Sequence, residues 1–206
     1  MNLSSDRTFA ESSASDEQLA GQARQGCRDS FEELARRFQV RLLRFLQRRV
    51  RSQADAEDLL QDTFVRAFER LNQYDPARPF STWLFTIAHR IAMSHHRRQQ
   101  AGARAGLVVA DQLRGAGHAE PDGRMADEES RQAFWETAAR VLTEEQFNAT
   151  WLFYVERMPA PQIADVLGRS WVSVKTLLFR ARRRLAPVVR ESGEAGLIGK
   201  PGLSYV

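Results

Sequence analysis

The sequence predicts an all-α fold: two small helical domains joined by a flexible linker, the C-terminal one containing a helix-turn-helix. Apolar residues recur at three- and four-residue intervals over most of the chain, and we find no convincing strand pattern. Residues 101–126 lose this periodicity and contain five of the chain's 12 glycines, as expected of a linker. In residues 159–185, two short helical patterns flank a glycine turn.

These patterns also set the domain boundaries. The 206 residues, 43% of them hydrophobic, can bury one or two small cores. We predict a first domain over residues 15–100 and a second over residues 127–190. Residues 1–14 are polar and serine-rich, so we expect a disordered N-terminus, and we expect residues 191–206 to be a tail.

The first domain is predicted to contain four helices. Ser15 and Gln18 have capping-box spacing for a short helix that ends at Gly26. The second helix keeps one apolar face over residues 31–46, and the third keeps one over residues 56–71, which includes Phe64 and Phe68. After a break that contains Asp75, Pro76 and Pro79, Ser81 is the predicted cap of the fourth helix.

The second domain begins with a helix packed by Phe134 and Ala138, and Thr143 with Gln146 forms a capping box for the next helix. In the helix-turn-helix, Gly168 closes the first helix and Ser170 caps the second. After Pro187 we expect a tail with little to fold around.

The second helix of that motif separates apolar from polar residues. Val174, Leu178 and Leu185 share a buried face, while the outside or flanks hold Lys175, Thr176, Phe179, Arg180 and Arg183. Such a helix can enter the major groove by its N-terminal turn while its basic end meets phosphates. The alternative is an amphipathic helix with a solvated basic face.

Composition narrows the class of protein. The net charge is +4 and the pI about 9.8, with nearly all positive charge on arginine, which suits phosphate and guanine. Cys27 is the only cysteine, so an intrachain disulfide and a CxxC metal knuckle are excluded. Without a long apolar run or a signal-peptide pattern, we expect a soluble, intracellular protein without membrane insertion, cytoplasmic if bacterial.

An acidic cluster opens the third helix and consists of Asp55, Glu57, Asp58 and Asp62. It can complement the helix dipole, or dock on a basic partner surface, since Asp55, Asp58 and Asp62 share a face. A metal site is a third option, but no His or Cys nearby in sequence completes a ligand set.

The fourth helix, FSTWLFTIAHRIAMSHHRR over residues 80–98, combines aromatic, hydroxyl and basic side chains. This composition can stack single-stranded bases and hold their backbone. The spacing of His89, His95 and His96 argues against a metal site within the helix, and core packing is the favoured role of Trp83.

Both domains resemble the extracytoplasmic-function sigma factors, the two-domain group of the bacterial sigma-70 family. The resemblance covers residues 16–100 and 127–186. It is carried by FEELARRF, DAEDLLQDTFVRAF, FSTWLFTIA with the trailing arginine pair, and QIADVLG followed by SVK and RAR.

The resemblance implies partners and site residues but no cofactor, no metal and no catalytic residue. The partners would be core RNA polymerase, through its β′ clamp helices and β flap, promoter DNA, and an anti-sigma factor. The implied polymerase-binding residues are Asp55, Asp58, Gln61, Asp62 and Phe64. The implied −10 residues are Arg78, Phe80, Ser81, His89, Arg90, Ser94, Arg97 and Arg98. The implied −35 residues are Ser170, Trp171, Ser173, Lys175, Thr176, Phe179, Arg180 and Arg183.

The chain departs from the family pattern at Arg90 and Ser94, near the −10 base pocket, and at Phe153, Trp171 and Leu177, near the −35 surface. We therefore expect an unusual −35 sequence. Two other functions remain open. One is a helix-turn-helix regulator with a helical dimerisation or sensor domain, and the other is a sigma-like adaptor or anti-sigma partner that binds polymerase or a regulator but cannot melt DNA. An enzyme is disfavoured, because no nucleophile triad, phosphate loop or buried carboxylate pair can be assembled.

Overall fold

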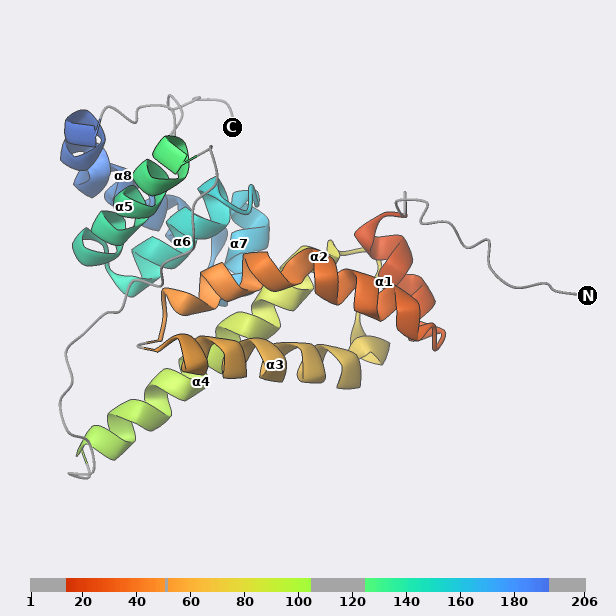
Figure 1. Cartoon of the computed structure of the whole chain (residues 1–206). Helices are drawn as coiled ribbons and strands as arrows, with labels where there is room; N and C mark the ends of the chain where they lie inside the picture. The colour runs from red at the N-terminus through yellow and green to blue at the C-terminus, as the bar shows by residue number, and fades with distance from the viewer. Residues whose placement is uncertain (1–13, 51, 105–124, 193–206) are drawn as a thin grey trace, which may run out of the picture.

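The computed structural model describes residues 14–50, 52–104 and 125–192, and every regular element within these ranges is helical (Figure 1). The elements are α1 (Asp16–Arg24), α2 (Arg28–Gln47), α3 (Gln53–Glu69), the 3-10 helix η1 (Leu71–Gln73), α4 (Phe80–Arg104), α5 (Met125–Val141), α6 (Glu144–Tyr154), α7 (Ala160–Leu167) and α8 (Trp171–Ser192). The predicted all-α fold is therefore confirmed. The expected disordered N-terminus lies almost wholly outside the described residues, as do most of the linker and of the tail.

Helices α1 to α4 form the first domain. The capping box is present: Ser15 Oγ accepts the Gln18 N–H and Gln18 Oε1 accepts the Ser15 N–H. Gly26, at φ 96°, ends the turn between α1 and α2, as the sequence predicts. The core lies between α2, α3 and α4, where the rings of Phe45 and Phe85 meet edge to face with centroids 5.0 Å apart.

Helices α5 to α8 form the second domain around a cluster of aromatic rings. Trp135 of α5 packs edge to face on Trp151 of α6, with ring centroids 4.9 Å apart. Helices α7 and α8 are the predicted helix-turn-helix. Gly168 adopts a left-handed conformation at φ 61°, and Ser170 Oγ accepts the Ser173 N–H at 3.2 Å. These two turn residues have the conformations that the sequence predicts.

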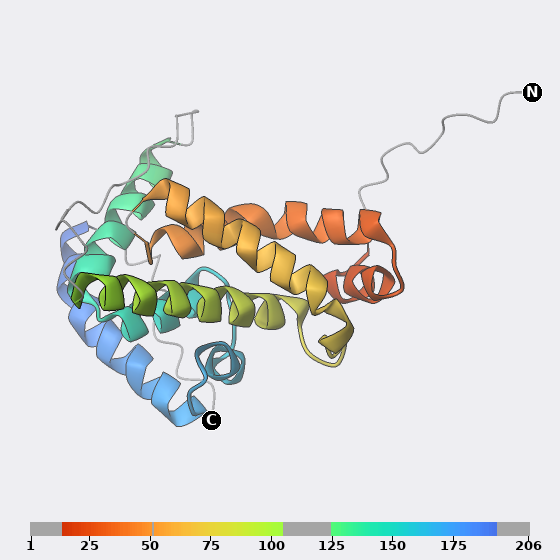
Figure 2. The same ribbon diagram turned by 90° about the horizontal axis from the view of Figure 1, so that it is seen from below.

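The two domains pack against each other, chiefly through α4 and α7. Figure 2 shows α1 at the end of the molecule farthest from α5 to α8. At the interface, Thr82 Oγ1 donates to Gln162 Oε1 at 3.1 Å. Polar contacts and buried apolar residues hold the two domains together in this structure.

Three local predictions are wrong. Helix α4 begins at Phe80, because the Trp83 N–H already donates to the Pro79 carbonyl, so Ser81 lies inside the first turn rather than capping it. Phe68 is 51% exposed instead of facing the core, and its ring rests on Phe31. Helix α8 continues through Pro187 to Ser192, although a proline removes one helical hydrogen bond.

Candidate nucleic-acid interface

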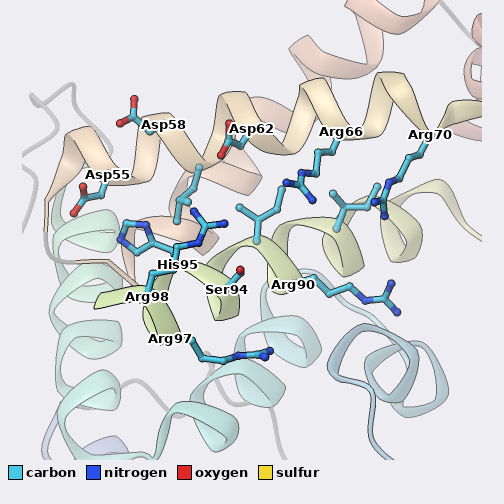
Figure 3. A pocket seen from close by; sticks show the side chains of 13 residues that line it. Asp55, Asp58, Asp62, Arg66, Arg70, Arg90, Ser94, His95, Arg97 and Arg98 are labelled. Carbon is cyan, nitrogen blue, oxygen red and sulfur yellow. The ribbon is translucent and has the colours of Figure 1, made fainter. Parts of the chain in front are cut away.

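A groove between α3 and α4 collects most of the charged residues predicted for the first domain (Figure 3). Asp55, Asp58 and Asp62 project from the N-terminal part of α3, and Arg66 and Arg70 follow towards its C-terminus. The opposite wall of the groove is α4, which contributes Ile87, Arg90, Ile91, Ser94, His95, Arg97 and Arg98. The groove therefore has an acidic end and a basic wall, and it can bind an anionic strand along α4 while α3 meets a cationic surface.

The acidic residues of α3 do not all serve the helix dipole. Ser52 caps the helix, since its side chain accepts the Asp55 N–H at 3.0 Å, and Asp55 is the acidic residue of the first turn. Dipole stabilisation falls off within that turn. Asp58 and Asp62 lie beyond the first turn and are exposed, as is Gln61, while Phe64 is half-buried. Their positions favour docking over dipole complementarity.

The loop before α4 is fixed by Tyr74, which is 2% exposed. Its hydroxyl donates to the Arg78 carbonyl at 2.7 Å, and burial raises the pKa of Tyr74 to about 12. The Arg78 guanidinium is exposed and reaches Asp165 of α7, with Nη1 3.6 Å from Oδ2. Arg78 thus lies at the domain boundary with its charge facing a carboxylate of the second domain.

Phe80 does not occupy the surface position expected of a DNA-contacting residue. It is 1% exposed, and its ring packs on Phe38, Tyr74 and Trp83 with centroid separations of 5.6, 5.4 and 5.5 Å. In this conformation its role is to fix the start of α4 to α2 and to the loop. Trp83 is half-buried in the same cluster, in agreement with its favoured core role.

His89 is not among the residues that line the groove. Its Nδ1 is buried and has no hydrogen-bond partner among the described residues. Burial, together with the positive charges of Arg49 and Arg90, lowers the pKa of His89 to about 4. A neutral imidazole at this position cannot pair with a phosphate. Arg90, Arg97 and Arg98 are exposed, and Ser81 and Ser94 are half-buried.

Arg49, at the end of α2, is a buried cation that sequence reasoning missed. Its guanidinium carbon lies 3.3 Å from the centroid of the Phe45 ring, and Nη1 donates to the Phe45 carbonyl at 2.6 Å. Nε and Nη2 are buried without a partner in the described part of the chain, and burial lowers the Arg49 pKa to about 9. Arg49 is one arginine among 30 Lys and Arg residues, and no local pattern marks it.

The outward face of α8 holds the predicted residues of the second domain together. All eight are exposed: Ser170, Trp171, Ser173, Lys175, Thr176, Phe179, Arg180 and Arg183. The Lys175 ammonium lies 4.3 Å from the Trp171 ring centroid, and the Arg183 guanidinium lies 6.0 Å from that of Phe179. This face combines cations with large rings and remains open in the folded chain.

Two arginines of α8 contact the other helices of the second domain, on the side away from the open face. Arg182 Nε donates to the Tyr154 hydroxyl at 2.9 Å and its guanidinium lies over Phe153, while Arg184 Nη1 donates to the Val141 carbonyl at 3.3 Å. Two arginines of α8 are thereby engaged in structure and are not part of the open face.

The described residues were compared with the requirements of a metal site and of a membrane-spanning helix. No group of three His, Cys, Asp or Glu side chains there lies close enough together to hold a metal ion. None of the helices described combines the length and apolar character that crossing a membrane requires.

Comparison with known proteins gives matches to both domains. The family model for Sigma-70 region 2 matches residues 34–102, and that for Sigma-70, region 4 matches residues 135–185. The chain is 30% identical over 187 residues to the RNA polymerase sigma factor CnrH of Cupriavidus metallidurans, covering 85% of this chain and 95% of CnrH. It is 29% identical over 172 residues to the ECF RNA polymerase sigma factor BldN of Streptomyces coelicolor, covering 82% of this chain and 64% of BldN.

Among solved structures, the fold is similar to that of CnrH in complex with the cytosolic domain of CnrY. The TM-score is 0.62 at 28% sequence identity, and the match covers 86% of this chain and 99% of CnrH.

Proposed function

The chain belongs to the sigma-70 family of RNA polymerase sigma factors, in its extracytoplasmic-function group, and we propose how its surfaces divide the work of promoter-specific initiation. The observation that carries the proposal is the order of charged surfaces along one chain. An acidic helix is followed by a basic, aromatic helix, and then by an open recognition helix.

We propose that α3 binds core RNA polymerase at the β′ clamp helices through Asp55, Asp58, Gln61, Asp62 and Phe64. The exposure of Asp58, Gln61 and Asp62, and the position of Asp62 ten residues into the helix, support this role. Carboxylates placed beyond the reach of the helix dipole gain most from a cationic partner surface. The second domain would dock at the β flap.

The basic wall of the groove is the proposed −10 surface. Arg90, Arg97 and Arg98 are exposed along α4 and can hold phosphates, with Ser94 between them. Unstacking a base costs a few kcal/mol per step, which contacts to the separated strand offset. Arg78, just before α4, and Ser81, in its first turn, are proposed to extend this surface beyond the groove. Phe80 is buried and the Nδ1 atom of His89 is buried, so these two residues would contribute by positioning α4.

The open face of α8 is the proposed −35 surface. Its N-terminal residues, Trp171 and Thr176 among them, would meet base edges in the major groove, while Lys175 provides charge. Arg180 and Arg183 lie further along the helix and provide charge for base edges or phosphates. The mechanism is recruitment and strand opening without bond chemistry, so the chain itself would not be an enzyme.

We infer two further features of the setting. CnrH was solved in complex with the cytosolic domain of CnrY, and by analogy this chain would be held by an anti-sigma factor until a signal releases it. Because core polymerase and the chromosome are its partners, it would act in the bacterial cytoplasm.

Transcription from genomic DNA with purified core polymerase tests the proposal. Adding the full chain should produce transcripts whose 5′ ends map to a small set of promoters with shared −35 and −10 sequences. Duplex binding by the chain alone, without transcripts, would instead establish the helix-turn-helix regulator. Core binding without strand opening, measured by permanganate reactivity of −10 thymines, would establish the adaptor.

A further inference from the structure

The outward face of α8 has an apolar centre. Val172 and Phe179 are 55% and 59% exposed, which places both among the exposed large apolar side chains of the described ranges. They are seven residues apart, so they lie on one line of the helix about 10 Å apart. Thr176 lies beside this line, and its hydroxyl donates to the Val172 carbonyl at 3.0 Å. That bond turns the hydroxyl towards the helix backbone and leaves the Thr176 methyl group free to contact a ligand.

Cations flank this apolar line. Lys175 is three residues after Val172 and Arg180 is eight residues after it, which places the two cations on opposite sides of the line. Lys175 is held over the Trp171 ring, 4.3 Å from its centroid, on the side away from Arg180. Arg183 follows towards the C-terminus beside Phe179. The surface is thus apolar in the middle and positive at its margins.

The major groove of DNA has the complementary arrangement. Phosphates line its two margins, and the apolar group that its floor presents is the C5 methyl of thymine. A protein surface would not need cations on both sides of an apolar line, whereas a groove between two phosphate backbones does. We propose that Val172, Thr176 and Phe179 read thymine methyl groups in the −35 element, while Lys175 and Arg180 fix the helix between the strands.

This inference rests on the proposed function, because it assumes that α8 faces −35 DNA in the polymerase complex. Its test uses the complete holoenzyme and a promoter recovered from the genomic transcription experiment. Each −35 thymine is replaced by uracil, which removes the methyl group and leaves base pairing and hydrogen bonding intact. Burying one such group corresponds to about fourfold in affinity. We expect holoenzyme binding to weaken by about that factor at one to three positions.

Substitutions in α8 test which side chain contacts which thymine methyl group. Val172→Ala should weaken binding to the thymine promoter and abolish the difference between thymine and uracil at one position. Phe179→Ala should do the same at another position. Val40→Ala is the matched control, since Val40 is 52% exposed but lies on α2, and it should keep the full thymine preference.

The inference and the proposed function can fail separately. A holoenzyme that starts transcripts but binds uracil and thymine promoters equally overturns the inference alone. A −35 element without A·T pairs would also overturn the inference alone. The same holds for a Val172→Ala holoenzyme that still distinguishes thymine from uracil at every position. Absence of transcripts in the genomic transcription experiment would overturn the proposed function.

Discussion

Arg41 of α2 and Glu156, just after α6, form an ion pair across the two domains, with Nη2 2.6 Å from Oε2 and 115 residues between them in the chain. The Glu156 side chain is 1% exposed, and burial raises the pKa of its carboxyl group, an effect that Arg41 partly offsets. The Arg41 guanidinium also lies 4.7 Å from the centroid of the Phe38 ring. The pair therefore ties the second domain to the core of the first.

Replacing Arg41 should weaken the contact between the domains. Arg41→Ala leaves the Glu156 carboxylate buried without its partner, which should cost about 2 kcal/mol, since Arg41 is itself 41% exposed. Urea unfolding measures the change. Arg36→Ala on the same helix is the control: Arg36 is 71% exposed, and its pair with Glu33 should be worth under about 1 kcal/mol. If both variants lowered the free energy of unfolding by the same amount, the interdomain pair would contribute no more to stability than an exposed surface pair.

The buried imidazole of His89 should make stability depend on pH. In the unfolded chain the group titrates near 6.5, whereas in the folded protein its pKa is about 4. Between these values the unfolded state binds the proton and the folded state does not, so stability falls as the pH falls. From pH 7 to pH 5 the loss due to His89 should be about 2 kcal/mol.

His89→Gln should remove that part of the pH dependence, as measured by urea unfolding at both pH values. His96→Gln is the control, because its ring lies on the surface of α4 with Nε2 2.6 Å from Gln100 Nε2. If the His89 variant showed the same slope as the wild type, the imidazole would not be held neutral by burial.

Two turn residues should respond in opposite directions. Gly168 has φ 61° with no atom within 4 Å of an added Cβ, so Gly168→Ala should cost about 1 kcal/mol through backbone strain alone. Arg157 has φ 55° although it carries a side chain, so Arg157→Gly should stabilise by a few tenths of a kcal/mol up to about 1. Thermal unfolding of the two variants measures both, and stabilisation by Gly168→Ala would contradict the left-handed turn.

Charge reversal tests the polymerase-binding role of α3. Asp58→Lys with Asp62→Lys should reduce affinity for core polymerase by about tenfold or more, because both carboxylates would face a cationic surface. Glu57→Lys, on another face of the same helix, should have little effect. Circular dichroism confirms that each variant is folded. Unchanged affinity of the double variant, measured by fluorescence anisotropy, would leave the acidic cluster with only a local role in the helix.

Arg180 is the best single test of −35 recognition. Arg180→Ala should weaken promoter binding by holoenzyme by about 1–3 kcal/mol, and relaxed preference at one position would show that its guanidinium contacts a base edge. Arg190→Ala, another exposed arginine near the end of α8, serves as the control. A uniform loss across all promoter sequences would assign Arg180 to a phosphate.

The elements that could be predicted from sequence are those whose cause is local. The side chains of Ser15 and Ser170 accept hydrogen bonds from backbone N–H groups in the first turn of their helices, and Gly168 ends α7 in a left-handed conformation. Gln18 completes the capping box with Ser15. All these partners lie within a few residues of each other, so their spacing alone predicts the helix ends. The separation of Val174 and Leu178 from Lys175 on α8 follows from helical periodicity, and the structure buries and exposes these side chains as expected. The family resemblance rests on the same local motifs.

The all-α class, several helix ends and the open face of α8 therefore follow from local sequence. The burial of Phe80 and of His89 Nδ1, the pair between Arg41 and Glu156, and the approach of Arg78 to Asp165 arise only from the packing of the helices. Capping and periodicity depend on neighbours within one or two turns. Desolvation and ion pairing instead depend on which distant helices pack together, and neither spacing nor composition encodes that.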